Sequence, residues 1–285
     1  MANESDLPYL IRLLDDKDPA VRPVVREQLA DFGGDISHDL AALGIDINFT
    51  GKKRLSRLLA PGRRETLRNE WVVPTGGAMA MEDDWESFEN TLRQISDFLH
   101  DGITLRPSLS DSLDLLMEEA LEDHVAPSAN ELRRWLFVDG PFKGIEKNVT
   151  NITNTMALGN FDLCHVINTH TGNATSLGCL FMLMGCRMGV QVDGCNYPGH
   201  FLARIDVEGR TQLIDCFHSG RKFDIDSLIE SHPEISEKAR SSVYASTHLG
   251  VILLRYVGEV QSSFIAMERT EDAALFVELA KTLHV

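Results

Sequence analysis

Two residues in the second half of the chain, His200 and Asp215, are of the types that activate a nucleophile. His200 opens one apolar segment and Asp215 closes the next, and Glu208-Gly209 between them predicts a hairpin turn. A hairpin with its turn at that point brings the two residues opposite each other to within a residue or two. Asp215 can then fix the tautomer of His200 and stabilise its protonated form, as the aspartate of a nucleophilic triad does.

The third member of such a site is a cysteine in the first turn of a buried helix, where unpaired backbone N–H groups and the helix dipole favour the thiolate. The residues from Leu177 to Val190 are nearly all apolar and predict a buried helix that Gly189 ends. The residues just before it, Gly172-Asn173-Ala174, contain no cysteine. The sequence therefore predicts the orienting pair of a thiol enzyme without its sulfur.

Three other residues near the predicted site carry a thiol or a hydroxyl. Cys179 follows Ala174 by about one and a half helical turns, where we expect a core position. Ser176 is nearer the helix start, and a serine there is typical of a cap or of a buried hydrogen bond. Cys195 stands in a predicted loop and is interpreted as a small core residue.

Four blocks of sequence carry a family resemblance. They are Gly172-Asn173-Ala174-Thr175-Ser176-Leu177, Arg187-Met188-Gly189-Val190, Tyr197-Pro198-Gly199-His200-Phe201-Leu202-Ala203-Arg204 and Leu213-Ile214-Asp215-Cys216-Phe217. As a set they closely resemble the bacterial SirB-type transglutaminase-like family, which typically reads Gly-Asn-Pro-Ile-Ser-Leu, Arg-Leu-Gly-Leu, Pro-Gly-His-Phe-Leu-Val-Arg and Ile-Asp-Pro-Phe there. The chain departs from that pattern at Ala174-Thr175, which replaces Pro-Ile, and at Cys216, which replaces a proline.

The resemblance implies a papain-like transglutaminase core whose catalytic cysteine is usually absent. Active transglutaminase-like enzymes read Gly-x-Cys with a small residue four positions after the cysteine, and this register places Ala174 at the cysteine and Gly178 at the small residue. Ala174, His200 and Asp215 are then the positions of a former triad. The resemblance also implies a helical N-terminus and a tetratricopeptide-like tail, which residues 256–283 match in degenerate form.

The remaining periodic segments predict helices and a few strands. Helices are expected at 7–14 with Ser5 as cap, 20–32, 84–99, 108–123, from Ser128 or Asn130 to Trp135, 239–257 and 260–283; strands at 190–195, 200–207 and 211–216; irregular chain from Asn148 to Asn160. The first two helices have the pattern of a single HEAT-type pair.

This order predicts an α+β fold: a transglutaminase-like, papain-like core of one buried helix and a small antiparallel sheet, wrapped by α-helical N-terminal and C-terminal segments. We expect a helical N-terminal segment over 1–72, a transglutaminase-like region over 78–233 with helices at 84–136 and a core at 160–225, and C-terminal helices over 234–285. A loop or hinge is expected at Val73–Gly77, between the first two.

Composition argues against several other classes of protein. The 27 basic and 43 acidic residues give a formal net charge of −16, which argues against a general nucleic-acid binder. Residues 52–68 hold 7 of the 27 basic residues, with Pro61-Gly62 expected to interrupt them. They predict either a solvated helix face or a docking patch for an acidic partner or for the acidic rest of the chain.

The cysteines and the apolar runs bear on location. Five cysteines without a C-x-x-C pair argue against a disulfide framework and a zinc ribbon, and they favour a reducing cytoplasm. The start of the sequence and its longest apolar run predict neither export nor membrane insertion. No cofactor or metal site is predicted, because phosphate loops, nucleotide fingerprints and metal-ligand spacings are absent from the sequence, and His165 and His170 make a poor metal pair.

The function that these patterns favour is binding without covalent chemistry. A groove around His200 and Asp215 would bind a peptide, a small ligand or a protein partner, with further candidate contacts at Asn173, Ser176, Cys195, Asn196 and Tyr197. Two alternatives stay open. One is an amidase, peptidase or other hydrolase that uses Cys195, Ser176 or a water activated by the His200–Asp215 pair. The other is a helical scaffold.

Overall fold

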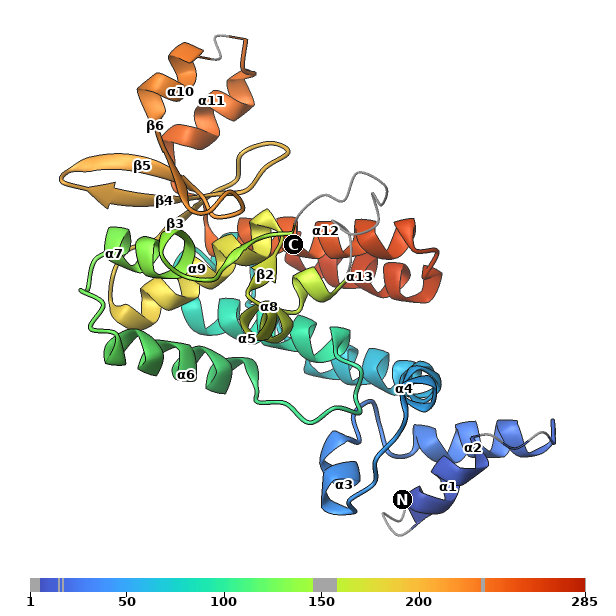
Figure 1. Cartoon of the computed structure of the whole chain (residues 1–285). Coiled ribbons are helices and arrows are strands. Elements are labelled where there is room, and N and C mark those ends of the chain that lie inside the picture. Colours follow the sequence, from blue (N-terminus) through green and yellow to red (C-terminus); the bar gives the residue numbers. More distant parts are fainter. Residues whose placement is uncertain (1–5, 15, 17, 146–157, 232–233, 285) are drawn as a thin grey trace. The chain divides into compact units, whose positions relative to one another are not determined.

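The computed structural model describes residues 6–14, 16, 18–145, 158–231 and 234–284 (Figure 1). The chain forms two compact units: unit 1 comprises residues 1–71 and 97–107, and unit 2 comprises 72–96 and 108–285. The predicted domain limits stay predictions, because a compact unit is not by itself a segment that folds alone. Ser5 and most of the predicted irregular run 148–160 lie outside the described residues.

Unit 1 is helical. Its helices are α1 (Leu7–Leu13), α2 (Val21–Ala30), α3 (Ser37–Ala42) and α4 (Phe49–Glu70). The pair α1 and α2 packs with α4 around fully buried side chains, among them Leu7, Leu29, Leu55 and Leu59. Burying each such side chain contributes about 2 kcal/mol. Helix α4 thus supplies the second contact face that a neighbouring repeat would give to the predicted HEAT-type pair, and the HEAT-type assignment itself stays a prediction.

Helix α4 is continuous through Pro61, so the predicted interruption at Pro61-Gly62 is wrong. A proline removes one backbone hydrogen bond, but Leu59 and Leu67 on either side of it are buried and hold the helix against its neighbours. Gly62 permits a close approach, because a Cβ there would lie 2.5 Å from the carbonyl carbon of Gly33. The Pro-Gly pair marks a packing contact of α4.

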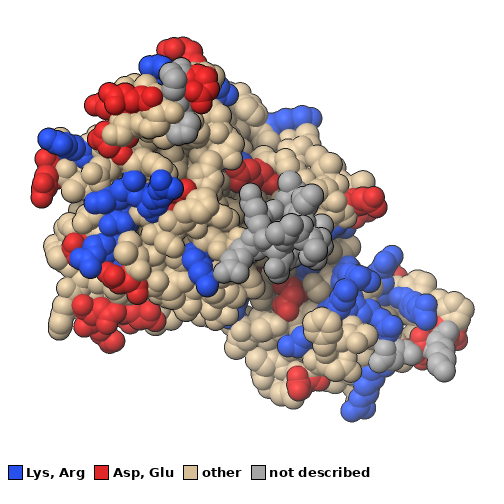
Figure 2. All heavy atoms as spheres, turned by 45° about the horizontal axis from the view of Figure 1, so that its top comes forward, with Lys and Arg blue, Asp and Glu red and all other residues tan. Residues whose placement is uncertain are grey.

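The basic residues of α4 do not share one environment. Most of them lie at the surface, and Figure 2 shows several Lys and Arg side chains close together on unit 1. Arg63, by contrast, is 9% exposed and donates hydrogen bonds to the backbone oxygens of Ser56 (2.9 Å) and Asp101 (3.0 Å). The predicted solvated face is therefore wrong for Arg63, which instead ties turns of unit 1 to α4.

Unit 2 has a buried helix at its centre. Helix α9 (Ala174–Met188) lies between the antiparallel sheet and α6 (Leu109–Glu122), and its residues from Thr175 to Gly185 are all buried. The other helical elements are η2 (Gly77–Ala80), α5 (Trp85–Leu99), α7 (Ala129–Arg133), the π-turn η3 (Arg134–Val138), η5 (Leu158–Phe161), α8 (Leu163–Thr169), α10 (Ile225–Ser231), α11 (Glu237–Tyr244), α12 (Leu249–Ala266) and α13 (Thr270–Leu283). All of these elements belong to unit 2 except residues 97–99 of α5, which belong to unit 1. The predicted α+β class, with one buried helix and a small antiparallel sheet, is confirmed.

The antiparallel sheet has four strands in sequence order, β3 (Asp193–Cys195), β4 (Leu202–Val207), β5 (Arg210–Asp215) and β6 (Arg221–Asp224). β4 and β5 form the expected hairpin, in which Glu208 and Gly209 both have positive φ, as two-residue turns of this kind need. A two-stranded parallel pair, β1 (Lys143–Gly144) and β2 (Thr171–Gly172), stands just before α9 in the fold. The sequence did not predict β6 or α10. For β6 the reason is that three of its four residues are charged, and only pairing with β5 makes them a strand.

The C-terminal helices differ from the two segments predicted at 239–257 and 260–283. Residues 245–248 separate α11 from α12, because Thr247 forms a β-bridge with Gly194. The predicted interruption near Gly258 is wrong, because Gly258 lies in the middle of α12 with open space around it. By length and composition α12 could cross a membrane, yet half of it is buried. Its close packing on α13 is typical of a core helix.

Candidate functional site

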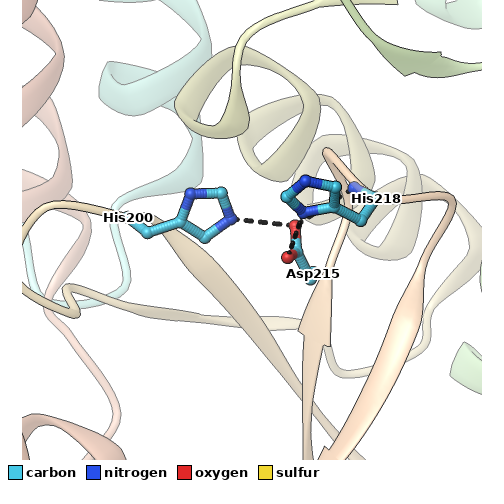
Figure 3. Close-up of side chains that lie close together, drawn as sticks. All are labelled: His200, Asp215 and His218. Carbon is cyan, nitrogen blue, oxygen red and sulfur yellow. Dashed lines mark hydrogen bonds and ion pairs between the residues drawn. The ribbon is translucent and has the colours of Figure 1, made fainter.

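His200, Asp215 and His218 form one cluster at the end of the sheet (Figure 3). His200 Nε2 lies 2.9 Å from Asp215 Oδ1, and His218 Nδ1 lies 2.6 Å from Asp215 Oδ2. The two imidazole rings are stacked, with centroids 5.8 Å apart. Asp215 is buried, the side chain of His200 is about one third exposed, and that of His218 is mostly exposed. The carboxylate is thus held beneath two imidazoles that open to solvent.

Asp215 is kept ionised by its partners. Burial would raise the pKa of its carboxyl, but hydrogen bonds from His200 and His218 and the charges of both rings outweigh burial and lower the pKa below its ordinary value. The backbone N–H groups of Phe217 and His218 also donate to Oδ1, at 3.1 and 3.2 Å. The carboxylate can therefore orient an imidazole on each side.

The sheet positions both ends of this cluster. β5 ends at Asp215, and its partner β4 starts at Leu202, two residues after His200, which itself lies in a turn closed by its N–H to the carbonyl of Tyr197. The strand predicted from His200 thus begins later, at Leu202, because His200 still belongs to this turn. Arg255 of α12 fixes this turn by donating to the carbonyl of Tyr197 and to the side chain of Asn196.

The start of α9 carries Ala174 at its first position, half-buried. Gly178 lies one turn further on the same helix face, and a Cβ there would come within 2.3 Å of the ring of Phe201. Ala174 is therefore on the face of α9 that meets the segment carrying His200. The assignment of Ala174 to the cysteine position of thiol enzymes stays a prediction, and in that register the side chain directed at the imidazole would be a methyl group.

Asn173 and Ser176, two predicted contact residues, are occupied by the helix cap. The Asn173 side chain accepts from the N–H of Ser176 at 2.8 Å, and the Ser176 hydroxyl accepts from the N–H of Asn173 at 3.0 Å. This reciprocal capping box satisfies two N–H groups that the helix start leaves unpaired. Because Ser176 is also fully buried, its hydroxyl is not placed to attack or bind a ligand.

Cys195 is likewise withdrawn from the cluster. It is fully buried, and its thiol donates to the carbonyl of Ser242 at 3.2 Å. Burial raises the pKa of Cys195 to about 11, against a smaller opposing effect of the Arg204 charge. A thiol with this pKa is almost wholly protonated at neutral pH and is a poor nucleophile.

The remaining cysteines are no better placed. Burial raises the pKa of Cys179 and of Cys216 far above the ordinary thiol value, and Cys164 is buried as well. Cys186 is exposed but lies near the other end of α9, roughly 18 Å along the helix from Ala174. None of the five cysteines, all within the described residues, can serve as the nucleophile for His200.

A cavity of about 430 Å³ opens beside the cluster. It is lined by Tyr197, His200, Leu202, Asp215, Arg221, Phe223 and Leu228. The guanidinium of Arg221 lies 4.8 Å from the centre of the Phe223 ring. Of the seven predicted contact residues, the structure places Tyr197, His200 and Asp215 at this cavity. The other four are engaged elsewhere: Asn173 and Ser176 cap α9, Asn196 accepts from Arg255, and the Cys195 thiol donates to Ser242.

Sequence reasoning missed His218 and the cavity wall on β6. His218 stands three residues after the strand-ending Asp215 and just before Ser219-Gly220, which both have positive φ. That turn folds the chain back into β6 and carries His218 over the carboxylate. The available signal for His218 was its place between the end of the predicted strand at Asp215 and the pair Ser219-Gly220, residue types that are common in turns. Arg221 had no such signal, because β6 becomes a strand only by pairing with β5.

The family follows from comparison with known proteins. Residues 105–257, more than half of the chain, match the family model described as the transglutaminase-like superfamily (Transglut_core2). The chain belongs to the transglutaminase-like superfamily. The matched residues include α9, the β4–β5 hairpin and His218, so the cluster lies inside the transglutaminase-like domain.

Relatives of this transglutaminase-like chain match it over part of their length. It is 28% identical over 118 residues to a UPF0162 protein of Xylella fastidiosa (strain Temecula1). The match covers 39% of this chain and 42% of that protein. It is 26% identical over 180 residues to F-box only protein 21 of Mus musculus, which covers 60% of the chain and 26% of that protein. The chain thus spans less than half the length of these relatives. No solved structure matches it.

Proposed function

We propose that this transglutaminase-like domain binds a peptide segment of a protein partner in the cavity beside His200 and Asp215, and forms no covalent bond to it. One observation carries the proposal: the first residue of α9, on the face toward the His200 segment, is Ala174. A thiol acyl transfer has no attacking atom there. Loss of a triad nucleophile costs about a millionfold in turnover, whereas a pocket and its hydrogen-bonding groups survive the loss.

The walls of the cavity suggest the chemistry of the bound segment. Tyr197, Leu202, Phe223 and Leu228 offer apolar and aromatic surface, while Arg221 offers an exposed cation at the rim. A segment with an apolar side chain followed by a carboxylate would place the first against the rings and the second on the guanidinium. The chain's net charge of −16 gives no general attraction for an acidic segment, so such recognition would have to be local.

Within the superfamily we assign the chain to the SirB-type branch. The four sequence blocks that resemble that branch fall on the start and end of α9, the His200 turn with β4, and the end of β5. All of them border the cluster or the helix that faces it, which supports a shared site. We also propose a cytoplasmic location, which the lack of a C-x-x-C pair among the five cysteines supports.

The peptide proposal is tested with short synthetic peptides and two neighbouring variants. The probe is a panel of fluorescently labelled hexapeptides with a central Leu, Phe or Ala followed by Asp or Asn, measured by fluorescence polarisation in a buffer with a chelator. We expect Leu-Asp or Phe-Asp peptides to bind, and Arg221→Ala to weaken them about tenfold, as loss of one charge-assisted hydrogen bond does. Lys222→Ala is the matched control, because successive residues of β6 point to opposite faces.

The same samples decide between binding and turnover. Mass spectrometry of the peptides after prolonged incubation should show them unchanged. Cleavage or deamidation that disappears in His200→Ala and persists in Ser176→Ala would instead support hydrolysis by a water that His200 and Asp215 activate. Equal weak binding by all peptides, or no difference between Arg221→Ala and Lys222→Ala, would contradict the proposed cavity site and favour a scaffold.

A further inference from the structure

His218 is the residue of the cluster that a former thiol site leaves unexplained. A triad needs one imidazole and one carboxylate, which His200 and Asp215 supply. His218 adds a second imidazole on the other oxygen of the same carboxylate, at 2.6 Å. Figure 3 shows the two rings directed at Asp215 from different sides. The cluster thus offers two imidazole nitrogens and one carboxylate. Asp215 lies at the end of β5, and His200 and His218 lie in two separate turns.

We propose that His200, Asp215 and His218 bind a divalent transition-metal ion. Two imidazoles and one carboxylate are a donor set that suits Zn²⁺ and its first-row neighbours. This inference goes beyond the peptide site and does not rest on it, because the three donors would hold an ion whether or not a peptide fills the cavity.

The distances fit an ion with small movements. Tetrahedral Zn²⁺ with bonds of about 2.0–2.1 Å keeps its donor atoms about 3.3 Å apart. Here the His200 and Asp215 atoms are 2.9 Å apart, the His218 and Asp215 atoms are 2.6 Å apart, and all three donor atoms lie within 4.8 Å of one another. The two hydrogen-bonded pairs involve different oxygens of Asp215 and are both closer than the required spacing, so the imidazoles must move away from the carboxylate by less than about 1 Å to admit an ion. His218 is mostly exposed in a turn, so it can shift at little cost.

The surroundings of Asp215 support the same assignment. Its Oδ1 accepts from the N–H groups of Phe217 and His218, which would keep the carboxylate oriented after an ion replaced the imidazole hydrogen bonds. Its Oδ2, bonded to the His218 ring, is then the oxygen that turns to the ion. Because burial falls from Asp215 to His200 to His218, the ion would enter from solvent.

Three protein donors leave a tetrahedral ion with one open position. The cavity shares two of the donors, His200 and Asp215, in its lining. An ion would therefore sit at the cavity wall, where a water or a carboxylate of a bound molecule could complete its coordination. The ion would add positive charge beside Arg221, which again favours an anionic group on the ligand.

The test uses the full chain with Cys186→Ser, so that this exposed thiol cannot contribute a ligand to Zn²⁺. Zn²⁺ is titrated against a competing chelating dye after removal of bound metal, and Co²⁺ is added in parallel so that its visible spectrum reports the donors. We expect one Zn²⁺ per chain and a Co²⁺ spectrum of nitrogen and oxygen ligation. His218→Ala should weaken Zn²⁺ about a hundredfold or more, since even supporting residues of metal sites contribute ten- to a hundredfold.

Matched variants keep the test independent of folding and of peptide binding. His284→Ala removes an exposed histidine outside the cluster and should leave Zn²⁺ affinity unchanged. Arg221→Ala removes no donor, and it takes away a positive charge near the ion, so it should not weaken Zn²⁺ binding while it weakens the peptide. Asp215→Asn should lose Zn²⁺, with circular dichroism confirming that it folds. Absence of saturable Zn²⁺ binding, or equal affinity in the parent and in His218→Ala, would overturn the metal site and leave the peptide result standing.

Discussion

Ala174→Cys is expected to create a reactive thiolate that depends on His200. A cysteine at this position would stand in the first turn of α9, near unpaired N–H groups, and on the face that meets the His200 segment. Thiols in such environments have pKa values of about 3.5–7.5, against about 8.5 for a free cysteine. The rate of alkylation by iodoacetamide, measured against pH in a Cys186→Ser background with a chelator present, should therefore reach half its maximum at least about one pH unit below the free-thiol value.

Two controls separate the histidine from the helix. In Ala174→Cys with His200→Ala, the midpoint of the rate profile should move up, because only the helix dipole then favours the thiolate. In Phe49→Cys the new thiol occupies the exposed first position of α4, which has the same asparagine cap and no acidic residue in its first turn. Its midpoint should lie above that of Ala174→Cys. Identical midpoints with and without His200 would show that Ala174 does not face the imidazole, and the proposed origin of the site would be wrong.

Arg63→Ala is expected to lower the free energy of unfolding of unit 1 by about 3 kcal/mol. The guanidinium is buried and donates to backbone oxygens of Ser56 and Asp101, with a longer contact of 3.4 Å to that of Gly34. Removing it leaves these oxygens without a charged donor and opens a cavity beside the turn at Gly34, whose own Cβ position is filled by the Arg63 backbone. Three segments of unit 1 would lose a common anchor.

Arg57→Ala is the matched control for this loss. Arg57 lies on the same helix with an exposed side chain, and its removal should change the free energy by less than about 0.5 kcal/mol. Because the chain has two compact units, a single unfolding curve would mix them, so hydrogen exchange of peptides from α2 and α4 is the appropriate measurement. Similar exchange in the two variants would mean that Arg63 is in fact solvated, as the sequence pattern suggested.

The sequence by itself determined the elements that local pattern controls. A run of apolar residues on all sides specified α9 as a buried helix, Gly189 specified its end, and Glu208-Gly209 specified the hairpin. Each of these features depends on residues within a few positions of one another, since helix caps, helix periodicity and two-residue turns are local. The pairing of His200 with Asp215 follows from that hairpin, and the absence of a sulfur at Ala174 can be read from one letter of the sequence.

Contacts between distant residues decided the rest. β6 becomes a strand because β5 offers it an unpaired edge, and this pairing makes Arg221 a cavity residue. The turn at Ser219-Gly220, which leads the chain back to β5, brings His218 into the cluster. Arg63 is buried, unlike most of its basic neighbours, because turns at Gly34 and Asp101 close over it. Residues 245–248 interrupt the predicted helix because Thr247 pairs with Gly194. Charge and polarity along the chain favoured solvent at most of these positions. Tertiary hydrogen bonds reversed that preference. Leaving a buried backbone oxygen or a strand edge without a hydrogen bond costs more free energy than burying the polar side chain, or ordering the polar strand, that supplies the bond.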